Sequence, residues 1–160
     1  MSQFRCTDNT TKRIVNVQFR VEQDECPDLS FIGEYSSEPR ADDVTVDRKE
    51  RNDMGRGEFR YFIAAMSGEQ TGNPESVEQD YQRMEEYNRG GWYMTFAFAE
   101  ADISINGVTQ TIRSGGLGGV ESDSGTYFDE IKAEQYNELK DILAGLGFTQ
   151  EQIDEAFADE

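Results

Sequence analysis

The pattern of apolar and polar positions first predicts strands. In residues Ile14–Val21 apolar side chains alternate with polar ones, as in a strand buried on one face; the apolar set is Val15, Val17, Phe19 and Val21. The aromatic segment Glu58–Met66 and the longer segment Trp92–Ile105 predict two more strands. Asn106-Gly107 separates the latter from Val108–Ile112, which predicts a β-hairpin with a type I′ turn.

Helical spacing marks three further segments. Asn73-Pro74-Glu75 has the residues of a helix start, Gly90-Gly91 ends the segment, and between them lie Val77, Tyr81 and Met84. Residues Tyr127–Leu146 predict a core-facing helix, with apolar positions at Tyr127, Ile131, Leu139, Ile142, Leu143 and Leu146. The segment Thr149–Gln152 has a capping-box pattern and predicts a short last helix, whose apolar residues are Ile153 and Phe157.

Together these elements predict an α+β fold. We expect an antiparallel sheet of three to five strands, one helix inserted between strands and two C-terminal helices. Residues 1–160 are expected to form a single domain, with an α+β body over residues 14–147 and a short acidic C-terminal helix within residues 148–160. Residues Asp24–Asp53 are rich in Pro, Ser, Gly and Asp, so a long ordered loop with one short strand is expected there.

Charge narrows the functions open to the chain. Its 160 residues include 33 Asp or Glu, 15 Lys or Arg and no histidine, so the formal net charge is −18. A groove that follows nucleic-acid phosphates needs a cationic face, so direct nucleic-acid binding is not expected. Without histidine, Ser-His-Asp and Cys-His nucleophiles and histidine-ligated zinc or haem sites are impossible. We therefore expect a protein that is not an enzyme and that needs no cofactor.

Cysteine usage and hydropathy bear on the compartment. Cys6 and Cys26 match neither a Cys-x-x-Cys redox pair nor a four-ligand metal site, which favours two free thiols in a reducing cytoplasm over a disulfide. The first residues lack the apolar run of a signal peptide, and no later apolar stretch approaches the ~20 residues that span a bilayer. We expect a soluble cytoplasmic protein that does not bind membranes.

Three short motifs invite a chemical interpretation. The run Gly115–Gly119 suggests a phosphate loop, but no Lys-Ser/Thr follows it and acidic residues flank it, so a strand-to-helix connection is favoured. Glu121 and Asp123 suggest a divalent cation or a metal-dependent hydrolase, although Asp/Ser runs before helices are more often caps. The segment Arg48–Arg60 carries five basic and three acidic residues. Internal ion pairs that pin the long loop are favoured there over a phosphate-contact patch.

The remaining candidate is the acidity itself, which is unevenly distributed. Residues 1–20 sum to +3 and residues 121–160 to −10, while the middle helix adds Glu75, Glu78, Glu85 and Glu86. In the last helix four carboxylates, at offsets of 0, 3, 4 and 8, share one face opposite the apolar residues. Rows of carboxylates on a rigid surface imitate duplex phosphates. The candidate partner-binding residues are therefore Glu121, Asp123, Asp129, Glu130, Glu151, Asp154, Glu155 and Asp159. An ordinary solvated face and adaptation to high internal salt remain the alternatives.

Four sequence blocks carry a resemblance to a known group of proteins. Residues Asp28–Pro39, Asp47–Phe62, Asp80–Tyr93 and Asn106–Ile131 resemble a family of short acidic proteins of phages, plasmids and other bacterial mobile elements. That family has an aromatic residue where this chain has Gly118, and the tail after Phe148 lies outside the shared pattern. The resemblance implies a mobile-element habitat. Small acidic proteins of such elements are similar in kind to anti-CRISPR and anti-restriction inhibitors that occupy the DNA-binding channel of a nuclease.

Charge and resemblance lead to one main hypothesis and one alternative. The main hypothesis is a protein-binding inhibitor in the host cytoplasm whose acidic surface occupies the cationic nucleic-acid-binding groove of a host DNA-targeting defence complex. The alternative is an accessory or regulatory interaction protein of the mobile element that contacts its partner through aromatic residues near Trp92 or through Asp28–Pro39, with acidity serving only solubility. Salt dependence distinguishes them, because electrostatic mimicry weakens steeply with added salt.

Overall fold

The chain folds into two compact units. The computed structural model describes residues 11–49 and 59–160. The first unit combines residues 11–24 with residues 94–160, and the second comprises residues 25–49 and 59–93. The second unit is thus an insertion between two strands that pair with each other, β1 (Lys12–Gln23) and β5 (Met94–Ile105). The expectation of a single domain stays a prediction.

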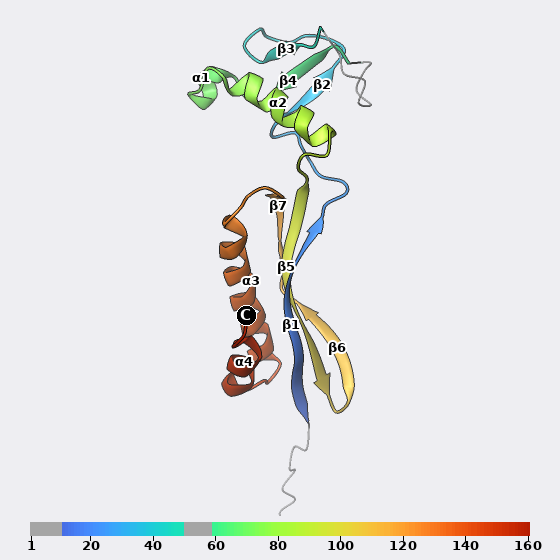
Figure 1. Ribbon diagram of the computed structural model, residues 1–160, viewed down its shortest axis with the longest axis vertical. Coiled ribbons are helices and arrows are strands. Elements are labelled where there is room, and N and C mark those ends of the chain that lie inside the picture. Colours follow the sequence, from blue (N-terminus) through green and yellow to red (C-terminus); the bar gives the residue numbers. More distant parts are fainter. Residues whose placement is uncertain (1–10, 50–58) are drawn as a thin grey trace, which may run out of the picture. The chain divides into compact units, whose positions relative to one another are not determined.

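The first unit is a four-stranded antiparallel sheet with two helices on one face (Figure 1). β5 is central, because β1 pairs along one side of it while β6 (Val108–Arg113) and β7 (Leu117–Glu121) pair along the other. The helices α3 (Tyr127–Gly145) and α4 (Gln150–Phe157) pack on the same face. This arrangement confirms the expected α+β class, the antiparallel sheet and the two C-terminal helices.

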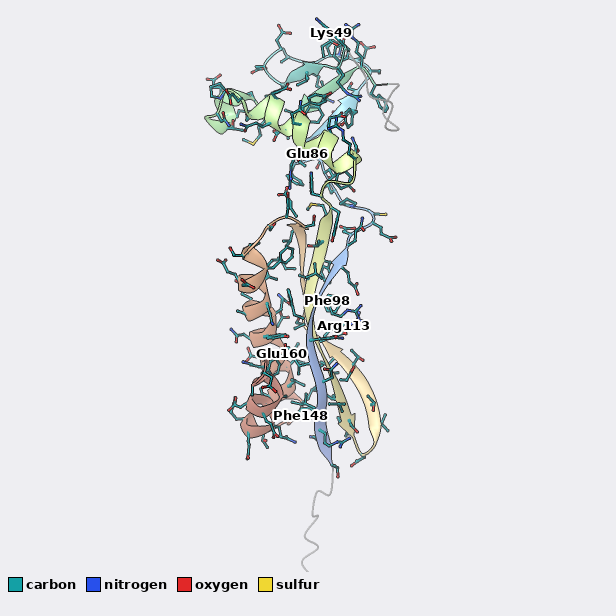
Figure 2. The ribbon with its side chains drawn as sticks, viewed as in Figure 1. Lys49, Glu86, Phe98, Arg113, Phe148 and Glu160 are labelled. Carbon is teal, nitrogen blue, oxygen red and sulfur yellow. The ribbon has the colours of Figure 1, made fainter. Side chains whose placement is uncertain are left out.

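Alternation along β5 builds the core of the first unit. Successive strand residues point to opposite faces, and the face toward the helices is lined by Ala97, Ala99, Ala101 and Ile103. Against it pack Leu139 and Leu143 from α3 and, further along, Phe148, Ile153 and Phe157, so α4 is an integral part of this unit (Figure 2). Burial of each of these large side chains contributes about 1.5–3 kcal/mol.

Two short sequence motifs in the first unit have the local structure that was predicted for them. Asn106 and Gly107 join β5 to β6 with φ angles of 52° and 82°, as a type I′ turn requires. The Asn106 Oδ1 also accepts the N–H of Thr11 at 2.9 Å, which ties the turn to β1. At the start of α4 the Thr149 hydroxyl accepts the Gln152 N–H and the Gln152 side chain accepts the Thr149 N–H, which confirms the capping box.

One strand departs from its predicted alternation. A β-bulge between Ile14 and Asn16 inserts an extra residue in β1. Ile14 then packs against the core beside Val17, while Val15 is 57% exposed and Val21 is also exposed. The prediction that Val15 belongs to the buried face was therefore wrong, because a bulge exchanges the faces of the residues before it. Val21 follows the bulge and is opposite Ala97, so it lies on the predicted face, but its side chain is exposed and not buried.

The second unit packs a helix on a small antiparallel sheet. The strands β2 (Gly33–Ser36), β4 (Tyr61–Ala64) and β3 (Thr45–Asp47) lie in that order, so the expected loop contains two strands rather than one. The short helix α1 (Gly68–Thr71), capped by Ser67, was not anticipated, and α2 (Ser76–Asn88) is the expected inserted helix. The predicted strand Glu58–Met66 appears as β4, and its first residue lies outside the described residues.

Candidate partner-binding surface

The eight predicted acidic residues lie in two groups on the first unit. Glu121 ends β7, Asp123 follows it, and Asp129 and Glu130 lie in the first turn of α3. Glu151, Asp154 and Glu155 lie on α4 and Asp159 just beyond it; these four are called the α4 carboxylates. Seven of the eight side chains are exposed and Glu121 is half-buried. Their exposure agrees with the prediction, and their role in partner binding stays a prediction.

The end of α4 connects the two groups. The carboxylate of Glu160 accepts the hydroxyl proton of Tyr136 at 2.8 Å and lies 3.8 Å from Lys132, both on α3. Lys132 is less than one turn from Asp129, so α4 returns along α3 toward the first group. The residues after α4 therefore lie beside the first half of α3, the helix that carries Asp129 and Glu130.

Within residues 11–49 and 59–160 the α4 carboxylates have no cationic partner. In the described part of the chain no Lys or Arg forms an ion pair with Asp129, Glu130 or any of the α4 carboxylates. Arg13 lines the same shallow cleft as Glu155 without pairing with it. The two lysines of α3 lie close to ring faces: Lys132 over Tyr136 and Lys140 over Phe157.

Helix dipoles account for only some of these charges. Glu151 in α4 and Asp129 and Glu130 in α3 lie in first turns, where a carboxylate is stabilised by the positive end of the helix dipole. Asp154, Glu155 and Asp159 lie toward the C-terminal end of α4, where the dipole disfavours negative charge and no basic residue compensates. The chain keeps acidic residues at positions where they oppose its own stability.

Two further acidic residues extend this surface. Glu134 and Asp141 lie on α3 and are exposed. They follow Glu130 by four and eleven residues, which places all three on the same side of the helix. Neither residue was predicted as part of the surface, although their spacing from Glu130 in the sequence is a signal that identifies them.

Elsewhere in the first unit a carboxylate is fully neutralised. Glu100 of β5 is 5% exposed on the sheet face away from the helices. It lies 3.2 Å from Arg20 and 3.1 Å from Arg113, and the Gln18 amide also donates to it. Both guanidiniums lie over the ring of Phe98; Phe98 and Arg113 are labelled in Figure 2. Burial alone raises the pKa of Glu100, but the hydrogen bonds from Arg20 and Gln18 and the charges of both arginines outweigh it and lower the pKa.

In the second unit, one of the acidic residues assigned to the middle helix is buried. Glu75, Glu78 and Glu86 are exposed, but Glu85 is 3% exposed and lies 3.4 Å from the buried Arg48. The Tyr35 hydroxyl donates to the same carboxylate at 2.8 Å, and burial together with this bond raises the pKa of Tyr35. Glu85 therefore counts toward the acidic total of the chain but not toward its exposed acidic surface.

The interpretation of the basic segment as internal ion pairs is confirmed where the structure describes it. Arg48 pairs with Glu85, and Arg60 makes two hydrogen bonds of 2.9 Å to Asp47. Arg48 Nη1 also donates to the Phe59 carbonyl, which fixes the two sides of the loop. Arg51 and Arg56 lie outside the described residues.

The glycine run does not form an anion cradle. The Gly115 N–H donates to Glu138 at 2.8 Å, and the Gly116 N–H donates to Gln135 at 2.9 Å, so α3 uses these amides. A Cβ on Gly116 would lie 2.3 Å from the ring of Phe96, so the missing side chain makes room for that ring. Leu117–Glu121 then forms β7 beside β5, and this strand replaces most of the connection that the sequence predicted.

The candidate metal site, membrane spans and the cysteines remain, and the described residues support no metal site and no spanning helix. Within residues 11–49 and 59–160 no three acidic or cysteine side chains form a group able to hold a metal ion, Glu121 and Asp123 included. The same part of the chain has no helix of sufficient length and apolarity to cross a bilayer. Cys26 is exposed, and Cys6 lies outside the described residues.

The alternative hypothesis places its aromatic contact near Trp92, where the neighbouring Tyr93 is exposed. Trp92 is 2% exposed, its indole N–H donates to the Arg83 carbonyl, and the Arg83 guanidinium lies 4.0 Å from the ring centroid. Trp92 is therefore a core residue of the second unit. Phe31, within the segment Asp28–Pro39, is 56% exposed.

Comparisons with known proteins complete the description of the candidate site. No protein-family model, no curated protein and no solved structure matches this chain.

Proposed function

We propose that this protein is a non-enzymatic, protein-binding inhibitor of a host DNA-targeting defence system, of the anti-CRISPR or anti-restriction type. Its acidic surface occupies the cationic groove in which the target complex holds nucleic acid. The observation that carries the proposal is the set of α4 carboxylates: exposed, without ion pairs in the described structure, and placed partly where the helix dipole disfavours them.

The use of arginine elsewhere in the chain supports this interpretation. Arg20, Arg48, Arg60 and Arg113 each neutralise a carboxylate within their own unit. If the acidity served only solubility, the few Lys and Arg residues would be expected to be distributed evenly among the acidic surfaces. The α4 carboxylates instead retain their charge on a rigid helix that is held by Ile153 and Phe157 in the core. A rigid anionic array can replace duplex phosphates in a cationic groove.

The resemblance to acidic proteins of mobile elements supports the same proposal, since those elements meet host nucleases. The target acts in the cytoplasm of the host, and no direct contact of this protein with nucleic acid or membrane is involved. The alternative, an accessory interaction protein, is favoured by one observation, the exposed Phe31. Its contact would be apolar and nearly insensitive to salt.

Competition with DNA tests the proposal. A purified CRISPR effector or restriction complex is titrated with the protein in the presence and absence of a duplex that contains its recognition site. The proposal predicts mutual exclusion: saturating duplex abolishes binding of the protein, and the protein blocks cleavage. Simultaneous binding of protein and duplex to the same complex would contradict occupancy of the groove, and absence of binding to any such complex at ~50 mM salt would contradict the inhibitor assignment.

A further inference from the structure

A shallow cleft of about 360 Å³ lies between α4 and the start of β1 in the first unit. Its lining residues are Arg13 and Ile14 from β1 and Gln152, Glu155 and Ala156 from α4. The Gln152 amide donates to the Lys12 carbonyl at 2.8 Å, which fastens the helix to the strand beside the cleft. The cleft therefore brings the basic residue Arg13 next to the helix that carries the α4 carboxylates.

Arg13 differs from the other basic residues of this unit. Residues 11–24 and 94–160 contain six lysines and arginines. Five of them have an ion pair, a hydrogen bond to a main-chain carbonyl or a contact with an aromatic ring: Lys12, Arg20, Arg113, Lys132 and Lys140. The side chain of Arg13 is exposed and has none of these contacts within the described part of the chain. Among the described cations of the unit, Arg13 is thus the one whose charge the fold does not use.

The separation of Arg13 from its nearest acidic neighbour in the cleft is unexpected. In a chain of net charge −18, an exposed arginine beside a carboxylate would be expected to pair with it. Glu155 lines the same cleft, yet the two side chains form no ion pair. Exposed ion pairs contribute little to stability, so the fold loses little by keeping these charges apart. Both charges stay available to a partner, and the acidic surface of α4 is bordered by a positive charge.

The groove of a DNA-cleaving enzyme is complementary to this mixed pattern of charge. Its walls are cationic because they follow the phosphates of the substrate. Its hydrolytic centre, in contrast, gathers carboxylates that hold divalent metal ions. A protein that covers only the walls needs negative charge alone, whereas one that also covers the centre needs a cation there. Arginine suits that position, because its guanidinium binds a carboxylate through two parallel hydrogen bonds.

We propose that Arg13 enters the carboxylate cluster that holds the divalent ions of the target nuclease, while the α4 carboxylates lie against the cationic walls of its groove. Arg13 then supplies at that centre the positive charge that a metal ion supplies in the active enzyme. This inference rests on the inhibitor function proposed above and specifies which part of the groove is covered. Because the guanidinium and the metal ion compete for the same carboxylates, each is expected to weaken the binding of the other.

Binding to a CRISPR effector nuclease or a restriction endonuclease without DNA, at constant ionic strength, tests the placement of Arg13. Millimolar Mg²⁺ is expected to weaken binding of the wild type at least about fivefold relative to EDTA. Arg13→Gln is expected to bind at least about tenfold more weakly than the wild type in EDTA and to lose the response to Mg²⁺. Arg89→Gln is the matched control, since it removes one exposed arginine charge from the second unit and should behave as the wild type does.

Displacement of the metal ion provides a second measurement. The nuclease is loaded with Mn²⁺ and titrated with the wild type, and the electron paramagnetic resonance signal of free Mn²⁺ should rise as Arg13 displaces the ion. At saturating concentration Arg13→Gln should leave the Mn²⁺ in place.

The outcomes separate this inference from the function on which it rests. Retention of Mn²⁺ under saturating wild type would overturn the placement of Arg13, even if binding in the groove persists. Equal affinities and equal Mg²⁺ responses of Arg13→Gln and Arg89→Gln would overturn it as well. Absence of wild-type binding to any such nuclease at low salt would overturn the inhibitor function and this inference together.

Discussion

Arg48 and Glu85 form an ion pair inside the second unit, with Nη2 and Oε1 3.4 Å apart and side chains 1% and 4% exposed. The α4 carboxylates have no such partner among the described residues, although the chain as a whole has far more acid than base. Cations neutralise the two buried carboxylates, Glu85 and Glu100, and pair with several exposed ones, but in the described structure none pairs with the α4 carboxylates.

Removing one partner of the buried pair is expected to destabilise the second unit strongly. Glu85→Ala leaves Arg48 charged and buried and deprives the Tyr35 hydroxyl of its acceptor, so the free energy of unfolding should fall by about 3–5 kcal/mol. Urea denaturation followed by the fluorescence of Trp92, the only tryptophan, measures it. The exposed neighbour provides the control, since Glu86→Gln should change stability by less than about 0.5 kcal/mol. Equal effects of the two variants would contradict the buried-pair account.

A side chain at position 116 is expected to destabilise the first unit, because it would collide with the ring of Phe96. Gly116 and Gly119 both have φ near +70° to +80°, so alanine at either position is strained. Only at Gly116 does a Cβ meet the ring, at 2.3 Å, whereas nothing lies within 4 Å at Gly119. Gly116→Ala should therefore destabilise the first unit by about 1–3 kcal/mol more than Gly119→Ala in thermal unfolding. Phe96→Ala should abolish that difference, and persistence of the difference would contradict the steric explanation.

Neutralising α4 at its two ends is expected to have opposite effects on stability. Glu151→Gln removes a charge that the helix dipole favours and should lower the free energy of unfolding by about 0.3–1 kcal/mol at low salt. Glu155→Gln removes a charge near the disfavoured end and should raise it by a similar amount. Chemical denaturation followed by circular dichroism measures both. A loss of stability from Glu155→Gln would show that this charge has a structural role.

The Glu100 cluster is expected to contribute to acid sensitivity. Because the pKa of Glu100 lies below its unfolded value, the ionised carboxylate stabilises the fold above that value. This stability is lost as pH falls from about 5 through the folded pKa. The free energy of unfolding of Glu100→Gln should therefore change less with pH in this range than that of the wild type. Identical pH profiles of the two proteins would be inconsistent with the lowered pKa.

The parts of the fold that could be predicted are those with strong local signals. Asn106-Gly107 and the Thr149–Gln152 capping box are determined by a few adjacent residues, and both formed as predicted. The faces of α4 also followed from spacing, because Ile153 and Phe157 must be buried and the carboxylates opposite them are then exposed.

Features that depend on distant residues could not be predicted in this way. Taken alone, the residues Gly116–Gly119 are typical of a loop. The need for glycine at position 116 comes from the ring of Phe96, twenty residues earlier, which occupies the space that a side chain would take. Glu85 is indistinguishable from Glu86 in the sequence, and only the approach of Arg48 explains its burial. The bulge that exposes Val15 is a matter of register with β5, which the alternation of β1 alone does not determine.

The central claim, that the α4 carboxylates bind a cationic groove, is tested most directly by the salt dependence of affinity for a DNA-binding defence complex. The triple variant Glu151→Lys, Asp154→Lys, Glu155→Lys is compared with Glu75→Lys, Glu78→Lys, Glu86→Lys, the α2 variant, which changes the net charge equally at exposed positions in α2 and at its N-cap. Wild type and the α2 variant should lose affinity steeply between ~50 and ~200 mM salt, and the α4 variant should bind weakly with a much flatter dependence. Equal slopes and affinities for the two variants would contradict the claim.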